Sequence, residues 1–275
     1  MKKGKVGFFD SGFGGLSILK NVIKDLPEYD YIYLGDTARN PYGTRTQEAI
    51  YKYTKQAMEF LIEEGCELII IACNSASSEA LPRIQEEIIN NNYKDKRILG
   101  VIIPASEEAV KITKNGEVGV IATSSTVSSN AFSREIAKLN KNLNVHQVAC
   151  PLLVSLVESG EEDDQIIKPI LSKYLNDKKF KGIDTLILGC THYGLLKDNI
   201  FKVLERSGKK INIIDEGVVV SKKLKKYLER HPEIENKLSK NGGKVFYTTD
   251  LTNGFQEKGS LFLGQEIKVE KINLE

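Results

Sequence analysis

The sequence has almost no excess of charge, no tryptophan and only four cysteines in 275 residues. Its 39 basic and 37 acidic residues leave a formal charge of +2, which excludes the strongly basic surface of a typical nucleic-acid binder. No apolar run approaches the ~20 residues that cross a bilayer; Leu68 to Cys73 is among the longest. We therefore expect a soluble protein whose partner is a small molecule, with neither nucleic acid nor membrane involved.

Signals for export and for disulfide formation are also absent from the sequence. The start MKKGKVGFFDSG has a basic tip, but Asp10 and three glycines interrupt what would have to be the apolar core of a signal segment. The cysteines Cys66, Cys73, Cys150 and Cys190 form no Cys-x-x-Cys pair. Thiols in a chain of this size without an evident leader are typical of a reducing compartment. We expect cytoplasmic localisation and no disulfide framework.

Apolar, β-branched runs alternate with longer helical patterns along the chain. Continuously apolar strands separated by amphipathic helices are typical of parallel sheets covered on both faces. The predicted strands are Val6–Phe9, Tyr31–Leu34, Leu68–Ala72, Ile98–Ile102, Val118–Ala122, Val145–Val148, Thr185–Leu188, Ile211–Ile214 and Lys244–Thr248. The sequence therefore predicts an α/β fold with mostly parallel sheets.

One helix is predicted in detail from the stretch TRTQEAIYKYTKQAMEFLIEEG. Thr44 with Gln47 three residues later suits a capping box, and Gly65 suits a helix stop. Apolar side chains recur on one helical face. These are Ile50, Tyr53, Ala57, Phe60 and Leu61.

Two parts of the sequence repeat each other. VGFFDSG (6–12) resembles VGVIATS (118–124) at an offset of 112 residues, from 6 to 118. ELIIIACNS (67–75) and DTLILGCTH (184–192) both run from an acidic residue through apolar residues to a cysteine, at an offset of 117 residues from Cys73 to Cys190. The shared order and spacing predict an internal repeat of two βα halves.

Two polar stretches, NNNYKDKR (90–97) and ERSGKK (205–210), are the predicted crossings between these halves. The first domain would comprise residues 1–97 and 210–275, and the second residues 98–209. The C-terminal part, with EIKVEKINL, would return to the first domain. Ligands in open α/β sheets bind at the carboxyl ends of strands. The residues expected there, in a cleft between the domains, are Asp10, Cys73, Thr123 and Cys190.

The two repeated cysteines suggest specific chemistry. Asn74 and Ser75 follow the first, Thr191 and His192 follow the second, and helix N-terminal amides are expected at both. The positive end of a helix lowers the pKa of a thiol, so we expect an environment that favours thiolate. A single cysteine after a strand is otherwise an ordinary core residue.

The pair Cys73 and Cys190 has four candidate chemical roles. Zinc would require three or four ligands, which the spacing of Cys190 and His192 does not suit. Thiol oxidoreductases usually carry close cysteine pairs, and a single nucleophile with His192 would leave the second cysteine unexplained. The fourth role uses both: one thiolate removes a proton from one face of a carbon acid, and the opposite thiol protonates the other face. That inverts a stereocentre.

Other motifs suit an amino-acid substrate. Asp10 opens SGFGGLS, whose amides are placed to hold a carboxylate, although Asp10 alone also suits a helix cap. Ser17 stands where a dinucleotide fingerprint needs its third glycine. The turn NPYGTR (40–45) brings Tyr42 and exposed amides toward a pocket. Glu158 and His192 are candidate proton partners of the thiols.

Five motifs, in this order, resemble the glutamate racemases of the aspartate/glutamate racemase superfamily. They are DSGFGGLSIL, GDTARNPYG, ACNSAS, ACPLLVSLVESG and GCTHYGLL. The resemblance extends from Val6 to about Gly264. It implies two flavodoxin-like αβα halves related by a pseudo-two-fold axis, with the active site in the cleft between them. It also implies an isomerase that interconverts L- and D-glutamate without pyridoxal phosphate or metal, supplying D-glutamate for peptidoglycan, cell wall biogenesis and cell shape, and that forms a homodimer.

The same resemblance assigns roles to individual residues. Cys73 and Cys190 match the two catalytic acid/base cysteines, and Asp10, Glu158 and His192 match residues that assist proton transfer. The matching substrate-binding residues are Asp10, Ser11, Tyr42, Gly43, Asn74, Ser75, Thr123, Thr126, Thr191 and His192. Ser75 departs from the family's usual threonine: the hydroxyl is kept and the methyl is lost, so hydrogen bonding should persist while packing loosens.

Alternatives from the sequence are a racemase of aspartate or another amino acid, a non-catalytic ligand-binding protein on the same scaffold, and a thiol redox protein. The paired cysteines with Asp10 and His192 argue against simple binding. A stable disulfide between Cys73 and Cys190 would favour the redox role.

Overall fold

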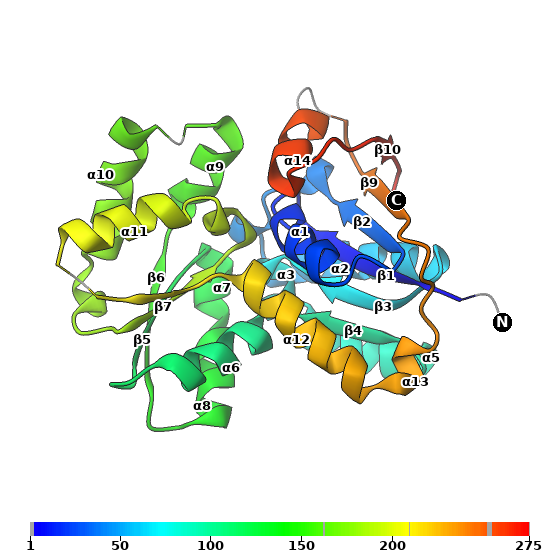
Figure 1. Ribbon diagram of the computed structural model, residues 1–275, viewed down its shortest axis with the longest axis horizontal. Helices are drawn as coiled ribbons and strands as arrows, with labels where there is room; N and C mark the ends of the chain where they lie inside the picture. The colour runs from blue at the N-terminus through cyan, green and yellow to red at the C-terminus, as the bar shows by residue number, and fades with distance from the viewer. Residues whose placement is uncertain (1–2, 162, 209, 252–254, 275) are drawn as a thin grey trace.

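The computed structural model describes residues 3–161, 163–208, 210–251 and 255–274, arranged as two parallel sheets with surrounding helices (Figure 1). The six-stranded sheet has the order β10 (Val269–Lys271), β9 (Lys244–Thr248), β2 (Tyr31–Gly35), β1 (Lys5–Asp10), β3 (Cys66–Ile71), β4 (Arg97–Gly100). The four-stranded sheet has the order β6 (Asn144–Ala149), β5 (Glu117–Ala122), β7 (Thr185–Gly189), β8 (Asn212–Ile214). Every pairing between these strands is parallel, which confirms the predicted α/β class.

Helices and short helical turns connect the strands. The helices are α1 (Leu16–Asp25), α2 (Gln47–Glu63), α3 (Asn74–Glu79), α4 (Leu81–Ile84), α5 (Asn90–Asn92), α6 (Ile102–Ile112), α7 (Ser124–Ser129), α8 (Ala131–Leu139), α9 (Pro151–Ser159), α10 (Asp164–Leu175), α11 (Lys197–Arg206), α12 (Glu216–Arg230), α13 (Pro232–Glu235) and α14 (Phe255–Leu263). Shorter turns are η1 (Thr37–Arg39), η2 (Tyr42–Thr44), the π-helical η3 (Gln85–Ile89), η4 (Lys178–Phe180) and η5 (Thr191–Gly194). In the described part of the chain, none of the helices combines the length and apolarity that spanning a membrane requires.

Alternate residues of the first sheet enter two separate hydrophobic layers. Phe8 of β1 belongs to the cluster that contains the buried faces of α1 and α12. Its neighbour Phe9 points the other way, into the cluster built with α2 and α3. Successive strand side chains face opposite sides of a sheet, so this split follows from the continuous apolar sequence of β1. The first half is thus an αβα sandwich.

The second sheet is covered in the same way. Ile121 of β5 and Leu188 of β7 face the helices α9, α10 and α11. Val120 and Ile187, one position away, face α6 and α8. Both halves therefore have helices on both faces of a parallel sheet, and Figure 1 shows the two sheets side by side with α12 along their junction.

The strand order confirms the repeat that the sequence predicted. Strands β2–β1–β3–β4 of the first sheet follow the same order as β6–β5–β7–β8 of the second. The repeated segments 6–12 and 118–124 contain the central strands β1 and β5, and the repeated cysteines follow the equivalent strands β3 and β7. Strands β9 and β10 extend the first sheet, as expected for the C-terminal part.

Strand pairing places both crossings later than the predicted boundaries at 97/98 and 209/210. Strand β4, predicted as Ile98–Ile102, ends at Gly100 and pairs with β3 of the first sheet, whereas Ile102 begins α6. Strand β8 pairs with β7 of the second sheet. The chain therefore crosses at residues 101 and 215, because hydrogen bonding to a neighbouring strand, and not local polarity, decides where a strand belongs. Residue 209, within the predicted linker 205–210, lies outside the described residues.

The predicted cap of α2 is wrong by two residues. Thr44 ends η2, and Thr46 is the residue whose hydroxyl accepts a hydrogen bond from the amide of Ala49, at 3.3 Å. The predicted stop is confirmed: Gly65 has φ +84°, a left-handed conformation that favours glycine. On the predicted apolar face, Ile50, Ala57 and Leu61 are buried, and Tyr53 and Phe60 are half-buried against them.

Replacing Thr46 by alanine should therefore lower the free energy of unfolding by about 1 kcal/mol, because the amide of Ala49 loses its partner. Thr44→Ala is the matched control and should change stability much less. Urea unfolding followed by circular dichroism measures both. A larger loss for Thr44→Ala would contradict the observed start of the helix.

Candidate active site

The carboxyl ends of the central strands of both sheets meet at one small cavity. Its volume is about 70 Å³. Cys73 follows β3 and precedes α3, and Cys190 directly follows β7. The predicted site residues that line the cavity are Ser11, Tyr42, Gly43, Cys73, Asn74, Ser75, Thr123, Cys190, Thr191 and His192. Asp10, Glu158 and Thr126, also predicted, lie behind this layer and reach it through hydrogen bonds.

Both cysteines are free thiols and nearly buried, with 5% of Cys73 and 7% of Cys190 exposed. Burial raises the pKa of the Cys73 thiol to about 11, and the charge of Asp10 adds to this, against the lowering effect of the Ala76 and Ser11 amides. Burial also raises the pKa of the Cys190 thiol well above its usual range, with a further contribution from the charge of Cys73. The expectation of an environment that favours thiolate is wrong, since desolvation outweighs the helix amides.

Cys190 lies at the end of a chain of side-chain contacts. Its Sγ is 3.8 Å from Nδ1 of His192, and Nε2 of the same ring is 3.0 Å from Oε1 of Glu158. Phe13 and Phe262 pack against the imidazole, each with its ring centroid 5.8 Å away. The chain Cys190–His192–Glu158 has the geometry of a proton relay in which the carboxylate orients the imidazole.

Glu158 is held in place by the first half of the molecule. Asn40 donates a hydrogen bond of 2.7 Å to its Oε1, and Lys258 of α14 donates to its backbone oxygen. Burial would raise the pKa of Glu158, but its hydrogen bond to His192 and the nearby charges lower the pKa overall. Glu158 is therefore an ionised partner for His192. Asn40 lies in the predicted turn 40–45 but was not singled out from the sequence.

Asp10 is completely buried beneath the cavity. Its Oδ2 accepts a 3.0 Å hydrogen bond from the amide of Gly12, and Thr191 donates to its Oδ1 at 3.4 Å. Burial raises the pKa of Asp10, and the charge of His192 partly opposes this shift. Asp10 thus joins the glycine-rich turn after β1 to the residue that follows Cys190, across the two halves.

Within the turn 40–45, Tyr42 and Gly43 line the cavity. The Tyr42 hydroxyl donates to Oδ2 of the buried Asp36, and the same oxygen accepts a 2.7 Å bond from Nε of Arg39. This hydroxyl is consequently engaged away from the cavity. The groups that Tyr42 and Gly43 can offer to a ligand are their amides.

A row of hydroxyls crosses the cavity between the halves. Oγ of Ser75 and Oγ1 of Thr123 are 3.0 Å apart, and Thr123 donates to Thr126 at 3.0 Å. Thr126 is fully buried and is a support for Thr123. The hydroxyl of Ser75 therefore makes the hydrogen bond expected at this position, although the threonine methyl is missing.

One buried acid at the site was missed by the sequence reasoning. Glu216 begins α12, and its Oε2 accepts a 2.7 Å hydrogen bond from Nδ2 of Asn74. Burial raises the pKa of Glu216 well above its usual range. The available signal was its position within two residues of the end of a predicted strand, as for Asp10 and the two cysteines.

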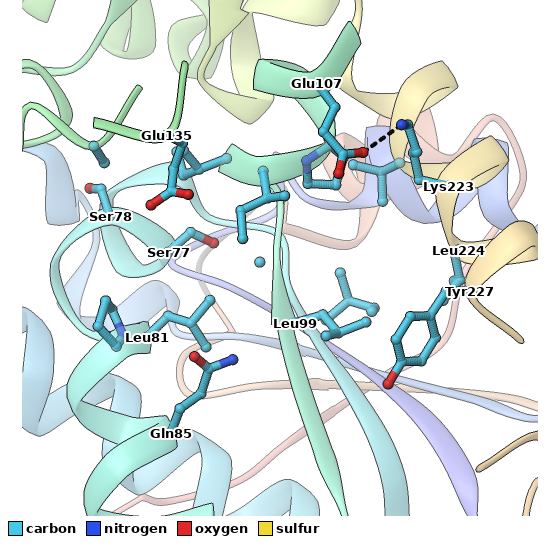
Figure 2. A pocket seen from close by; sticks show the side chains of 18 of the residues that line it. Ser77, Ser78, Leu81, Gln85, Leu99, Glu107, Glu135, Lys223, Leu224 and Tyr227 are labelled. Carbon is cyan, nitrogen blue, oxygen red and sulfur yellow. Dashed lines mark hydrogen bonds and ion pairs between the residues drawn. The ribbon is translucent and has the colours of Figure 1, made fainter. Parts of the chain in front are cut away.

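A second, larger cavity of about 390 Å³ lies behind α3. Figure 2 shows it lined by Ser77 and Ser78 of α3, with Leu99 from β4 and Tyr227 from α12, and with the ion pair of Glu107 and Lys223 at its edge. It contains no cysteine. The smaller cavity is the candidate active site, because the nucleophilic and acid/base groups converge there. Among the described residues, no group of three or more His, Cys, Asp or Glu side chains is arranged to hold a metal ion.

Comparison with known proteins agrees with this geometry. A model of the family described as Asp/Glu/Hydantoin racemase matches residues 16–220. A glutamate racemase from Persephonella marina is 40% identical over 269 residues, which cover 98% of this chain and 97% of that protein. The crystal structure of glutamate racemase from Francisella tularensis in complex with D-glutamate superposes with a TM-score of 0.89, at 36% identity and with 100% and 99% of the two chains covered.

This chain belongs to the aspartate/glutamate racemase family. The membership that the five motifs predicted is thereby confirmed. An aspartate racemase of Picrophilus torridus shares the fold, with a TM-score of 0.56, 19% identity and coverage of 82% and 95%. At that identity the likeness concerns the fold alone. As a member of the aspartate/glutamate racemase family, the chain is an isomerase that acts on an amino acid.

Gly14 allows Thr191 and His192 to approach the glycine-rich turn closely. A Cβ at this position would lie 2.4 Å from Oγ1 of Thr191 and 2.7 Å from Cε1 of His192. Gly14→Ala should lower the free energy of unfolding by about 1–3 kcal/mol through overpacking and should shift the NMR signals of the His192 ring. Gly194→Ala is the matched control, since a Cβ there meets nothing within 4 Å. Equal effects of the two substitutions would contradict this account of Gly14.

The raised thiol pKa values predict how Cys73 reacts without substrate. Because the neutral thiol is favoured below the raised pKa of about 11, the rate of alkylation by iodoacetamide at Cys73 should rise roughly tenfold per pH unit through pH 9 and show no plateau near the ordinary thiol pKa. Site-resolved mass spectrometry measures the rate, and the chain unfolded in guanidinium gives the reference profile. A plateau below pH 8 at Cys73 would show that the thiolate is already favoured in the free protein.

Proposed function

We propose that this chain interconverts L- and D-glutamate by a two-base mechanism in which Cys73 and Cys190 act on opposite faces of Cα, without pyridoxal phosphate or metal. The observation that carries the proposal is the pair of buried free thiols on one small cavity, each placed by an equivalent strand end of a repeated sheet. A relative with 36% identity over the whole chain has been crystallised with D-glutamate, which supports glutamate as the substrate.

Substrate binding supplies the charge that the thiols lack. An α-ammonium group in the cavity places a positive charge beside both sulfur atoms, and an opposite charge within a few ångströms favours the ionised form of a thiol. Asp10 and His192 lie beside Thr191 and help to position that group. The pKa of the base is therefore lowered in the complex relative to the free protein.

Proton removal from Cα then requires stabilisation of the negative charge that develops on the α-carboxylate. The α-hydrogen is far less acidic than a thiol, so a thiolate alone is inadequate. Backbone amides and hydroxyls at Asn74, Ser75 and Thr191, which line the cavity, are assigned to donate to the carboxylate, and one such donor contributes about 3 kcal/mol to the transition state. The reaction thus needs these donors as well as the base.

The opposite thiol completes inversion by giving its proton to the other face of Cα. The proton removed by one cysteine stays on that sulfur, and the other cysteine becomes the thiolate, so the next turnover runs in reverse or waits for proton exchange. His192, with Glu158 behind it, adjoins only Cys190 and is assigned to that proton transfer. Ser11, 3.5 Å from Sγ of Cys73, is the corresponding hydroxyl neighbour on the other side.

The physiological role proposed with this activity is the supply of D-glutamate for peptidoglycan, and hence for cell wall biogenesis and cell shape. A cytoplasmic location and a homodimer complete the proposal. Racemisation of aspartate is the second candidate, but the likeness to the aspartate racemase of Picrophilus torridus concerns only the fold. The free state of Cys73 and Cys190 supports proton transfer over a redox role.

The deciding experiment follows chirality and α-deuterium together when the purified protein is incubated with L-glutamate in heavy water and a metal chelator. The proposal expects D-glutamate carrying solvent deuterium at Cα. Cys73→Ser and Cys190→Ser should each lower kcat by roughly 10²- to 10⁴-fold, because each removes one base. Cys66→Ser, a buried cysteine outside the cavity, is the matched control.

Near-normal racemisation by both cavity variants would contradict the assignment of the cysteines. Activity on aspartate but not on glutamate would favour the second candidate. Glutamate binding without exchange at Cα would favour a binding protein.

A further inference from the structure

A buried acid at the start of α12, just after the chain crosses back from the second half, holds an amide at the active site. Glu216 follows β8 of the four-stranded sheet, and Asn74 follows Cys73 at the end of the six-stranded sheet. Their side chains meet at 2.7 Å, with Nδ2 of Asn74 donating to Oε2 of Glu216. Only 4% of Glu216 and 2% of Asn74 is exposed. This contact joins the first turn of α12 to the residue beside the catalytic cysteine.

The folding of α12 does not require the carboxyl of Glu216. Asp215 caps the helix, since its Oδ1 accepts a 3.0 Å hydrogen bond from the amide of Gly217. Among the described residues, no cation forms an ion pair with Glu216, although Asp215 is paired with Lys197 at 3.3 Å. Burying an acid without a cationic partner costs free energy. A role at the cavity, where Asn74 is its partner, accounts for an acid at this position.

Packing fixes the place from which Glu216 reaches Asn74. A Cβ at Gly217 would lie 2.6 Å from Nδ2 of Asn21 and 3.1 Å from the backbone oxygen of Ser17, so the first turn of α12 lies directly against α1. One turn later, Ser221 donates to the Asn21 backbone oxygen at 3.1 Å and to Asp25 at 2.7 Å. Glu216 is therefore anchored independently of Asn74.

The bond to Glu216 determines what Asn74 can offer to a ligand. One amide hydrogen is taken by Glu216, whereas Oδ1 of Asn74 is buried and has no hydrogen-bond partner among the described residues. A side-chain amide has distinct donor and acceptor ends, so fixing the nitrogen fixes the oxygen as well. Asn74 lines the cavity. Its unpaired oxygen requires a donor, and an amino acid brings one in its α-ammonium group.

We propose that Glu216 is a positioning residue that holds the amide of Asn74 so that its Oδ1 receives the α-ammonium of the substrate. The inference rests on the proposed function for the identity of the substrate. It gives the start of α12 a part in binding at the Cys73 side, without contact between Glu216 and the substrate. Loss of the hydrogen bond between Asn74 and Glu216 should weaken binding of the substrate and of the transition state equally. KM should therefore rise while kcat stays nearly unchanged.

Two conservative variants test the length of the Glu216 side chain separately from its acid group. Glu216→Asp keeps the acid but is one methylene too short for Asn74, so KM for glutamate should rise about tenfold while kcat changes by less than about threefold. Glu216→Gln keeps the reach and an acceptor oxygen, and should restore KM to within about threefold of the unsubstituted chain. Ser221→Ala is the control for disturbance of α12, because it loosens the helix without touching Asn74.

Ligands with and without the ammonium group test the direction of Asn74. Affinities for D-glutamate and for glutarate, which lacks the amine, are measured by calorimetry in the same proteins, so the result does not depend on turnover. Glu216→Asp should weaken D-glutamate about tenfold and glutarate by less than about twofold. Thermal unfolding of each variant shows whether the fold is intact.

Several outcomes would overturn the inference. Equal weakening of both ligands would show that Asn74 does not receive the ammonium. KM and affinity could be unchanged in Glu216→Asp, or the defect in Glu216→Gln could be as large as that in Glu216→Asp. Either result would show that the hydrogen bond from Asn74 to Glu216 does not determine substrate affinity. Failure of the proposed function is distinct: the unsubstituted chain would then bind glutamate without racemising it, and the calorimetric comparison would still decide the role of Glu216.

Discussion

The carboxyl ends of parallel strands all lie at one edge of their sheet, and this constraint brings both cysteines to the cavity and Asp10 beneath it. Strands β3 and β7 occupy equivalent positions in two sheets of the same order, so the cysteines that follow them reach a common point from opposite halves. In the proposed mechanism, a stereocentre between them would present one face to each sulfur. The repeat in the fold would thereby supply the near-symmetry that a reaction with mirror-image substrates and products requires.

Burial is the main cause of the shifted thiol pKa values at the site. The same desolvation that raises the thiol pKa values also strengthens every interaction with a charged ligand, because the local dielectric is low. Burial alone therefore favours the neutral thiols, and in the proposed mechanism their ionisation is coupled to the arrival of the substrate's ammonium group. The pKa values of Asp10 and Glu158 shift in opposite directions. Burial raises the pKa of Asp10, whereas the contact with His192 and nearby charges lower the pKa of Glu158 in spite of burial.

Much of the fold and of the cavity was predictable because apolar strands and the residues after them carry a strong local signal. The repeat, the parallel sheets and the placement of Cys73 and Cys190 all followed from such runs. Three features could not be predicted, since they depend on partners distant in the sequence. They are the membership of strand 97–100, which is decided by pairing with β3, the orientation of the Tyr42 hydroxyl, which is decided by Asp36, and the pKa of Cys73, which is decided by burial. The start of α2 was misplaced because both Thr44 and Thr46 suit a cap.

The hydrophobic core that lies beneath the cavity belongs to both halves at once. A single cluster of buried side chains runs from Phe8 and Leu19 of the first half through Phe13 and Tyr193 to Ile200 and Leu171 of the second. Two halves that share a continuous core cannot lose their structure separately without exposing it to water. We therefore expect the chain to unfold as one cooperative unit despite its two sheets, so that a destabilising substitution in either half lowers the melting temperature of the whole.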